Sequence, residues 1–205
     1  MIKNILFDWS GTLADDLRPV LKASNAIFRD FGRKELTLDE FRQHFRLPFA
    51  GFYAQFIPEA SSEGLETLYD RFFTGMHGEV ELIPGAREML DFCKATSRRT
   101  FLLSTIKTTH FIDQAGRLGV LDAFEHPYTQ VMDKREKIRE ILRERNLIPS
   151  ETIFVGDMIH DIETARHGGV MSVAVLTGFD SLEKLAPARP DVIVPDLTKL
   201  QALLA

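Results

Sequence analysis

The sequence has a single cysteine and no long apolar segment, and both absences restrict the classes of protein it can belong to. Cys93 cannot form an internal disulfide, and its surroundings, REMLDFCKA, predict the buried side of a helix rather than a catalytic thiol. No apolar run approaches the roughly 20 residues needed to cross a bilayer. The first 30 residues also lack the pattern of a signal peptide. We therefore expect a cytoplasmic protein with no membrane partner.

Dense basic stretches are also absent. The formal net charge is −5, and the most basic segment, DKREKIREILRER, interleaves lysine and arginine with acidic residues. Such alternation is typical of a solvated helix face, so we expect no nucleic-acid partner. The chain has 205 residues, 44% of them hydrophobic, which is enough for one domain-sized core with a modest insertion.

Short apolar segments alternate with helical segments along most of the chain. Near-continuous apolar strands separated by helices indicate a parallel sheet that is covered on both faces. The predicted fold is therefore α/β, a Rossmann-like open parallel sheet sandwiched by helices. The predicted strands are residues 2–7, 99–104, 152–156, 171–176 and 191–194, and the predicted helices are 85–96, 109–118, 134–145, 161–167 and 198–204.

The segment between Asp16 and Glu81 follows a different pattern. It has no convincing strand, and helical periodicity covers 19–32, 37–45 and 63–73. It also holds nine of the 16 phenylalanines, which predicts a small aromatic core of its own. We expect two domains: an α/β core formed by residues 1–15 and 82–205, and a helical cap formed by residues 16–81, inserted after the first strand.

Polar side chains follow three of the predicted strands. Asp8 ends the first, Ser104 ends the second, and Gly156 and Asp157 end the third. Because parallel strands share one carboxyl edge, where ligands bind in open α/β sheets, these side chains should converge. A single aspartate after a strand is more often a turn or cap residue, so the combination carries the prediction of a site.

These residues lie in motifs that resemble those of the haloacid dehalogenase superfamily, whose members are mostly Mg²⁺-dependent phosphatases. The first motif is FDWSGT with Asp8, the second is FLLST with Ser104, and the fourth is VGDMIHD with Asp157 and Asp161. The resemblance extends from residue 2 to about residue 200. It implies a phosphate-ester hydrolase, and the helical insertion resembles the small cap of the phosphoglycolate phosphatase-like members.

The third motif of that superfamily is a lysine ahead of the fourth, and two lysines compete for it. Lys134 lies 23 residues before Asp157, and Ile138 and Leu142 follow it at one and two helical turns. This matches phosphatases in which the lysine opens the helix. We therefore assign the role to Lys134 rather than to Lys137.

The resemblance implies a role for each matching residue. Asp8 is the expected nucleophile, since a carboxylate can attack phosphorus to give an acyl phosphate. Mg²⁺ prefers oxygen ligands and usually takes one or two carboxylates. The expected metal residues are Asp8, the Ser10 carbonyl, Asp157 and, through water or by orienting the loop, Asp161. The expected phosphoryl-binding groups are Trp9 and Ser10 through their backbone, Ser104, Thr105 and Lys134.

Ser10 departs from the pattern, because most phosphatases of the superfamily have an aspartate two residues after the nucleophile. That aspartate acts as general acid and base, whereas a serine hydroxyl does neither efficiently near pH 7. We expect slow turnover of alkyl phosphates and a preference for good leaving groups. A weak phosphate-binding pseudoenzyme and a phosphonatase-like C–P hydrolase are the alternatives. Phosphonatases share the DW pair but need a cap lysine, and residues 41–56 contain none.

Three residues of the insertion are candidates for substrate specificity. Arg46, Phe49 and Tyr53 lie where the substrate-facing loop of a cap is expected, and Arg46 could pair with a substrate carboxylate. A surface arginine and two packed aromatic residues would give the same pattern. The expected substrate is a phosphorylated small molecule, and the sequence does not indicate which one or the oligomeric state.

Overall fold

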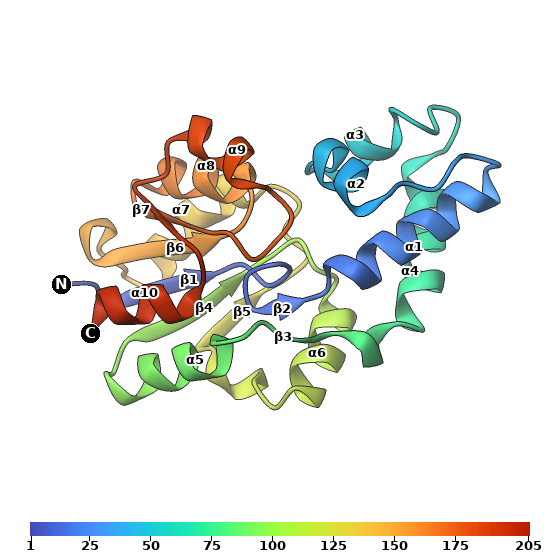
Figure 1. Ribbon diagram of the computed structural model, residues 1–205. Helices are drawn as coiled ribbons and strands as arrows, with labels where there is room; N and C mark the ends of the chain where they lie inside the picture. The colour runs from blue at the N-terminus through green and yellow to red at the C-terminus, as the bar shows by residue number, and fades with distance from the viewer. The chain divides into compact units, whose positions relative to one another are not determined.

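The predicted strands pair into one six-stranded parallel sheet in the computed structural model, which describes residues 1–205 (Figure 1). The sheet order is β5-β4-β1-β6-β7-β8. The first strand therefore lies at the centre and the winding reverses between β1 and β6, as in doubly wound α/β folds. This confirms the predicted fold class. The strands are β1 Asn4–Phe7, β4 Arg99–Leu103, β5 His126–Tyr128, β6 Thr152–Gly156, β7 Met171–Val175 and β8 Val192–Val194.

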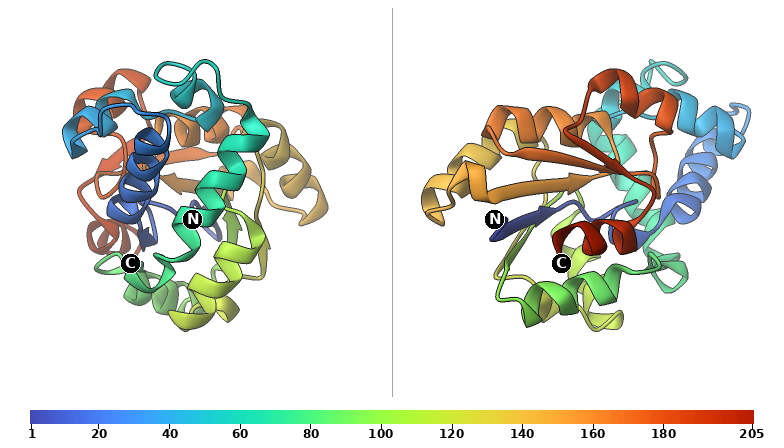
Figure 2. Two further views of the ribbon diagram at one scale, coloured as in Figure 1. Left: turned by 90° about the vertical axis from the view of Figure 1, so that its right-hand side faces the viewer. Right: turned by 60° about the vertical axis from the view of Figure 1, so that its left-hand side comes forward.

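Helices cover both faces of this sheet (Figure 2). Leu6 of β1 and Phe154 of β6 alternate with residues that face the opposite side, and they pack against Ile138 and Ala165 of the helices α7 and α8. On the other face lie α5, α6 and α10. The helix bounds are α5 Ala86–Ala95, α6 Thr108–Arg117, α7 Lys134–Glu144, α8 Ile159–Gly168, α9 Leu182–Leu185 and α10 Leu197–Leu204.

The chain divides into two compact units. Unit 1 comprises Met1–Asp15 and Glu81–Ala205 and contains the sheet, and unit 2 comprises Asp16–Val80. Two short strands, β2 Ala14–Asp15 and β3 Glu81–Leu82, pair antiparallel at the two ends of the insertion. The chain therefore leaves unit 1 and returns to it at neighbouring points.

Unit 2 is helical and is built around aromatic side chains. Phe28 contacts Phe52 and Phe56 at ring-centroid distances of 5.9 and 5.3 Å, and Phe52 contacts Phe41 at 5.4 Å. Thr37 and Glu40 form a capping box at the start of the second helix. The phenylalanines thus form the expected core. The helices are α1 Leu17–Asp30, α2 Leu38–His44, α3 Phe49–Tyr53 and α4 Ser62–Thr74.

Several short elements were absent from the sequence prediction, among them β5 and α3. Strand β5 has three residues and contains Pro127, so neither its length nor its composition indicates a strand; it lies at the edge of the sheet, where proline is tolerated. Helix α3 occupies part of the segment expected to be a loop. The longest helix, α1, has 14 residues, and no helix combines the length and apolarity needed to cross a membrane.

Candidate active site

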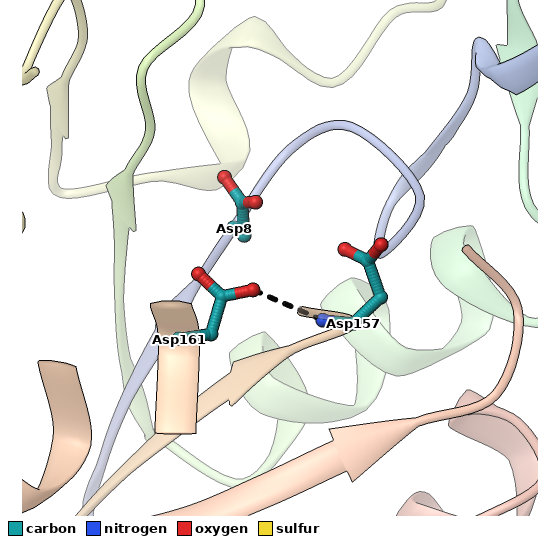
Figure 3. A group of neighbouring side chains, drawn as sticks. All are labelled: Asp8, Asp157 and Asp161. Carbon is teal, nitrogen blue, oxygen red and sulfur yellow. Dashed lines mark hydrogen bonds between the residues drawn. The ribbon is translucent and has the colours of Figure 1, made fainter. Parts of the chain in front are cut away.

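The carboxyl ends of β1 and β6 bring three aspartates together. Asp8 follows β1 and Asp157 follows β6, and the Asp8 N–H donates to the carbonyl of Val155 at 2.9 Å. Asp161 lies in the first turn of α8. One carboxylate oxygen from each aspartate lies within 4.8 Å of the others, and all three residues are buried (Figure 3). The cluster therefore occupies the switch point of the sheet, where ligands bind in this class of fold.

Lys134 is the cation of the cluster. It is the first residue of α7, it is fully buried, and its Nζ lies 2.9 Å from Asp8 Oδ1 and 2.8 Å from Asp161 Oδ1. Burial alone would lower the pKa of Lys134, but Asp161 and Asp8 outweigh it and raise that pKa above its ordinary value. The lysine is therefore charged in this site. Lys137, by contrast, pairs with Glu140 at 2.6 Å, outside the cluster.

Asp161 is engaged by the protein itself. Its Oδ2 accepts the backbone N–H groups of Asp157 at 3.1 Å and Met158 at 3.0 Å, while Oδ1 faces Lys134. The first of these bonds is the dashed line in Figure 3. Its carboxylate thus caps the start of α8 and fixes the turn that carries Asp157.

Asp157 is held by one donor on each oxygen. Oδ1 accepts the Thr12 hydroxyl at 2.9 Å, and Oδ2 accepts the Phe179 N–H at 2.8 Å. Burial, followed by the charges of Asp161 and Asp8, raises the pKa of Asp157 well above its usual range. A carboxylate has about four lone-pair sites. Asp157 therefore keeps acceptor capacity for a further partner.

Gly11 and Gly178 have no side chain at the points where the Asp157 carboxylate packs against them. A Cβ on Gly11 would lie 2.4 Å from Asp157 Oδ2, and one on Gly178 would lie 2.0 Å from the same atom. Gly11 also has φ +73°, a conformation that other residues adopt at a cost. Both the turn after β1 and the loop after β7 therefore need glycine next to this carboxylate.

The neighbours of Asp8 shift its pKa in opposite directions. Burial raises its pKa; Lys134 opposes the rise and Asp161 adds to it. The Ser104 hydroxyl, itself buried at the end of β4, lowers the pKa of Asp8. The structure thus brings Asp8 and Lys134 into direct contact and places Ser104 near them.

The segment after Asp8 turns sharply. Ser10 is half-buried and forms an isolated bridge with Ala14. Its side chain offers a hydroxyl and no carboxylate. The Trp9 side chain is buried away from the site, and its indole N–H donates to Gln114 Oε1 at 2.7 Å. The indole of Trp9 therefore packs inside unit 1 and does not face a ligand. Thr105 is half-buried in the turn that follows Ser104.

The candidate specificity residues of unit 2 have different environments. Tyr53 is buried, its hydroxyl bonds to Ser24 Oγ at 3.0 Å, and burial raises its pKa to about 12. It belongs to the aromatic core rather than to a substrate-facing surface. Arg46 is exposed and its Nη2 donates to the Gly51 carbonyl at 3.2 Å, while Phe49 is half-buried beside Tyr53.

Three contacts of the site were not predicted. Thr12 and Phe179 bind Asp157, and Gln114 binds Trp9. Thr12 is the last residue of the first motif, which was a usable signal; Phe179 and Gln114 lie far along the chain and carry none. His160 is half-buried, and burial lowers its pKa to about 4, so its imidazole adds no charge near neutral pH.

The cluster suits a divalent metal ion. Three buried carboxylates face a single ammonium group. Burial is the main cause of the raised pKa of Asp8 and of Asp157, and the charges of the neighbouring carboxylates add to it. Hard divalent cations prefer such oxygen ligands. Asp161 already accepts two N–H groups and a lysine, so Asp8 and Asp157 are the carboxylates that fit direct ligation.

The doubly wound sheet and the acidic site at its switch point define a class of α/β enzymes. A family model described as haloacid dehalogenase-like hydrolase matches residues 5–175, and the chain belongs to that family. The family predicted from the four motifs is confirmed, as is the expectation of a hydrolase. Members of this family generally use a divalent metal ion, which agrees with the carboxylate cluster.

Several named proteins are similar to this chain along nearly its whole length. A phosphoglycolate phosphatase from Synechococcus elongatus is 26% identical over 191 residues, covering 91% of this chain and 90% of that protein. A 5'-nucleotidase from Pseudomonas aeruginosa is 26% identical over 211 residues, covering 98% and 95%. A pyrophosphatase, PpaX, from Anoxybacillus flavithermus is 25% identical over 211 residues, covering 99% and 97%.

Solved structures share the fold. A phosphatase described as predicted, from Clostridium acetobutylicum, has a TM-score of 0.89 at 19% identity and covers 100% of this chain and 98% of its own. A haloacid dehalogenase-like hydrolase from Streptococcus pneumoniae has a TM-score of 0.86 at 23% identity, covering 100% and 99%. At this level of identity the likeness establishes the fold alone.

Proposed function

We propose that this protein is a Mg²⁺-dependent cytoplasmic phosphatase of phosphorylated small molecules that uses Asp8 as its nucleophile. The observation that carries the proposal is the placement of Asp8 at the switch point of the sheet, buried, 2.9 Å from the Lys134 ammonium and grouped with Asp157. The relatives named as phosphoglycolate phosphatase, 5'-nucleotidase and pyrophosphatase support a phosphorylated metabolite as substrate.

The proposed chemistry has two steps. An Asp8 carboxylate oxygen bonds to phosphorus as the bond from phosphorus to the leaving group breaks, which leaves an aspartyl phosphate. Water then attacks that phosphorus, the phosphorus–Asp8 bond breaks, and inorganic phosphate and the free carboxylate form. Splitting the hydrolysis in this way replaces one difficult step by two easier ones.

The remaining residues bind and orient the phosphoryl group. The Lys134 ammonium, 2.9 Å from Asp8 Oδ1, and the Ser104 hydroxyl would bind phosphoryl oxygens, with Thr105 and the backbone N–H groups of Trp9 and Ser10 completing the cradle. Asp8, Asp157 and the Ser10 carbonyl would hold Mg²⁺, with Asp161 fixing the turn. When bound, Mg²⁺ supplies charge that offsets the repulsion between carboxylates and phosphate.

Ser10 narrows the substrates that this site can turn over well. The position offers a hydroxyl in place of the carboxyl group that would protonate a departing alkoxide. Positioned acid–base catalysis contributes roughly 10²–10⁴-fold to a reaction rate. Its absence should slow substrates with poor leaving groups most, because their leaving oxygen needs a proton. We therefore expect acyl, anhydride and aryl phosphates to react faster than alkyl phosphates.

Unit 2 is the proposed cap, which would carry leaving-group specificity. Arg46 is the residue best suited to bind a substrate carboxylate, because it is exposed and its guanidinium makes only a hydrogen bond to a backbone carbonyl at 3.2 Å. Phe49 is the second candidate, since part of its ring remains exposed.

The test is a panel of alkyl, aryl and acyl phosphates, assayed with Mg²⁺ and with excess chelator, on the wild type, Asp8→Asn, Ser10→Asp and the exposed control Asp122→Asn. We expect turnover that needs Mg²⁺, favours good leaving groups and is lost by at least about 10³-fold in Asp8→Asn but unchanged in Asp122→Asn. Turnover that persists in Asp8→Asn would refute the covalent mechanism.

The same panel separates the two alternatives. An inert wild type that gains activity in Ser10→Asp would favour a phosphate-binding pseudoenzyme. Release of acetaldehyde from phosphonoacetaldehyde, together with borohydride trapping on a lysine, would favour the phosphonatase-like reaction. The absence of a lysine from residues 41–56 argues against that second alternative.

A further inference from the structure

Trp9 and Gln114 form a buried pair directly behind the proposed nucleophile. Trp9 is the only tryptophan, and its indole N–H donates to Gln114 Oε1 at 2.7 Å across 105 residues of sequence. Neither residue has any exposed surface. The indole also meets Phe111 edge-on at a centroid distance of 5.1 Å. The side chain next to Asp8 is therefore fixed both by packing and by one hydrogen bond.

The hydrogen bond between these two side chains fixes the orientation of the Gln114 amide. An indole N–H can only donate, so the carbonyl oxygen of Gln114 must face it and the amide NH₂ must point elsewhere. That NH₂ nitrogen is buried and has no hydrogen-bond partner. A buried unsatisfied donor costs about 1–3 kcal/mol. A methionine at position 114 would remove that donor but would leave the Trp9 indole N–H without its acceptor, so the glutamine is the residue that fixes the indole.

The Trp9 backbone is the anchor of the turn that follows. Its carbonyl accepts the N–H groups of Leu13 and Ala14, each at 2.9 Å, and Gly11 N–H donates to the Ala14 carbonyl at 2.8 Å. These bonds close the turn around Ser10. A displacement of Trp9 would consequently move the whole turn.

The same turn is tied to the acidic cluster. The Thr12 hydroxyl binds Asp157 Oδ1 at 2.9 Å, and the Thr177 hydroxyl binds the Gly11 carbonyl at 2.8 Å. Contacts therefore run without interruption from Gln114 through Trp9 and the turn to Asp157. All of these residues belong to unit 1.

We propose that Gln114 is a positioning residue of the active site, which fixes the Trp9 indole and through it the backbone of residues 9–12 beside Asp8 and Asp157. This inference rests on the proposed function, because it assumes that Asp8 reacts and that this backbone contacts the phosphoryl group. A backbone cradle shifted by a fraction of an ångström should bind the substrate nearly as well but fit the transition state poorly. Its loss should therefore lower kcat more than it raises KM.

The experiment compares Gln114→Met with Gln201→Met, the same change in α10 of unit 1. For Gln114→Met we expect kcat to fall by about 10- to 100-fold with KM within about threefold, since small misplacements carry losses of this size. Trp9 reports on the pair directly, because its fluorescence should shift when the indole N–H loses its acceptor. Gln201→Met should retain the wild-type kcat and emission.

A double variant separates positioning from simple stability. Trp9→Phe with Gln114→Met removes both partners, so no indole donor is left unpaired and stability should recover relative to Gln114→Met. Under the proposal kcat stays low in the double variant, because the clamp is still absent. Recovery of kcat together with stability would overturn the proposal, as would an unchanged kcat in Gln114→Met when the Trp9 emission has shifted.

Two further measurements keep the inference distinct from the proposed function. Turnover that survives Asp8→Asn refutes the proposed function, whereas turnover that requires Asp8 but survives Gln114→Met refutes only the positioning role. If the wild type turns over no substrate in the panel, affinity for orthovanadate and for inorganic phosphate, each with Mg²⁺, is measured by thermal shift. Gln114→Met should then weaken vanadate about 10-fold or more and phosphate little, since vanadate resembles the transition state; equal effects on both would overturn the proposal.

Discussion

The two units of this protein bury polar groups in different ways. Apart from Asp16 at its start, the buried polar side chains of unit 2 are neutral and serve the fold: Asn25 accepts from and donates to the backbone of Leu36 at 2.9 Å, and Ser24 pairs with Tyr53. In unit 1 three buried carboxylates and the Lys134 ammonium gather at one point. The contrast locates the chemistry in unit 1, because buried charges are costly and are rarely kept for stability alone.

The physical reason lies in what each arrangement requires. A neutral hydrogen-bonded pair contributes roughly 0.5–1.5 kcal/mol and needs nothing further. In unit 1 three buried carboxylates face one lysine, and burial, followed by the charges of neighbouring carboxylates, raises the pKa of Asp8 and of Asp157. Unit 2 is therefore complete as a packed helical body, whereas the site in unit 1 is built to receive additional charge.

Among the changes that test this comparison, Lys134→Met should lower the stability of the protein most. Removing one partner of a buried ion pair leaves uncompensated charge and typically costs about 3–5 kcal/mol. The control Lys137→Met removes only a partly exposed contact to Glu140 and should change stability by less than about 1 kcal/mol. Urea unfolding monitored by circular dichroism measures both. Equal effects would mean that Lys134 does not stabilise the cluster.

Gly178→Ala should cause the second-largest loss of stability. Its Cβ would lie 2.0 Å from Asp157 Oδ2, so the carboxylate or the loop must move, at a cost of about 1–3 kcal/mol and with loss of turnover. The same change at Gly116, within α6 and with nothing within 4 Å, should stabilise by about 0.5–1 kcal/mol. Thermal unfolding and phosphatase assays together decide; a tolerated Gly178→Ala would show that this loop does not constrain Asp157.

Tyr53→Phe tests whether a buried polar group of unit 2 serves stability alone. The change removes the hydrogen bond to Ser24 and should lower stability by about 1 kcal/mol. Because Tyr53 lies in the aromatic core, KM and kcat should remain those of the wild type. A raised KM at unchanged stability would instead place the phenol in contact with substrate.

The smallest predicted effect is a pH dependence confined to unit 2. The hydrogen bond from the Thr37 N–H lowers the pKa of Glu40 to about 2 from its usual 4.5. A lowered folded-state pKa gives stability that is present above pH 4.5 and is lost as the pH falls towards 2. Glu40→Gln should therefore be less stable than wild type at pH 6, with the difference shrinking below pH 4. Chemical unfolding at each pH tests this; a difference independent of pH would contradict it.

Much of the fold was predictable because its signals are local. The apolar strands, the polar residues that end them and the lysine that opens α7 all follow from short patterns, and the parallel sheet and the family are confirmed. Strand β5 was not predictable, since three residues that include Pro127 pair only because β4 offers an open edge. Helix α3 was missed for a similar reason, because five residues are too few to establish a period.

The sequence by itself determined which chemical groups this protein has and where its strands lie along the chain. Because the strands are parallel, it also determined that Asp8 and Asp157, which follow two of them, lie at the same edge of the sheet. Only the tertiary structure decided how those groups are used. In the folded protein Asp161 caps the helix to which it belongs, and Lys134 contacts two carboxylates. Trp9 also forms a hydrogen bond with Gln114. The reason is physical: a strand or cap depends on neighbours in the chain, whereas a contact across 105 residues depends on distances and angles that exist only after the sheet has formed.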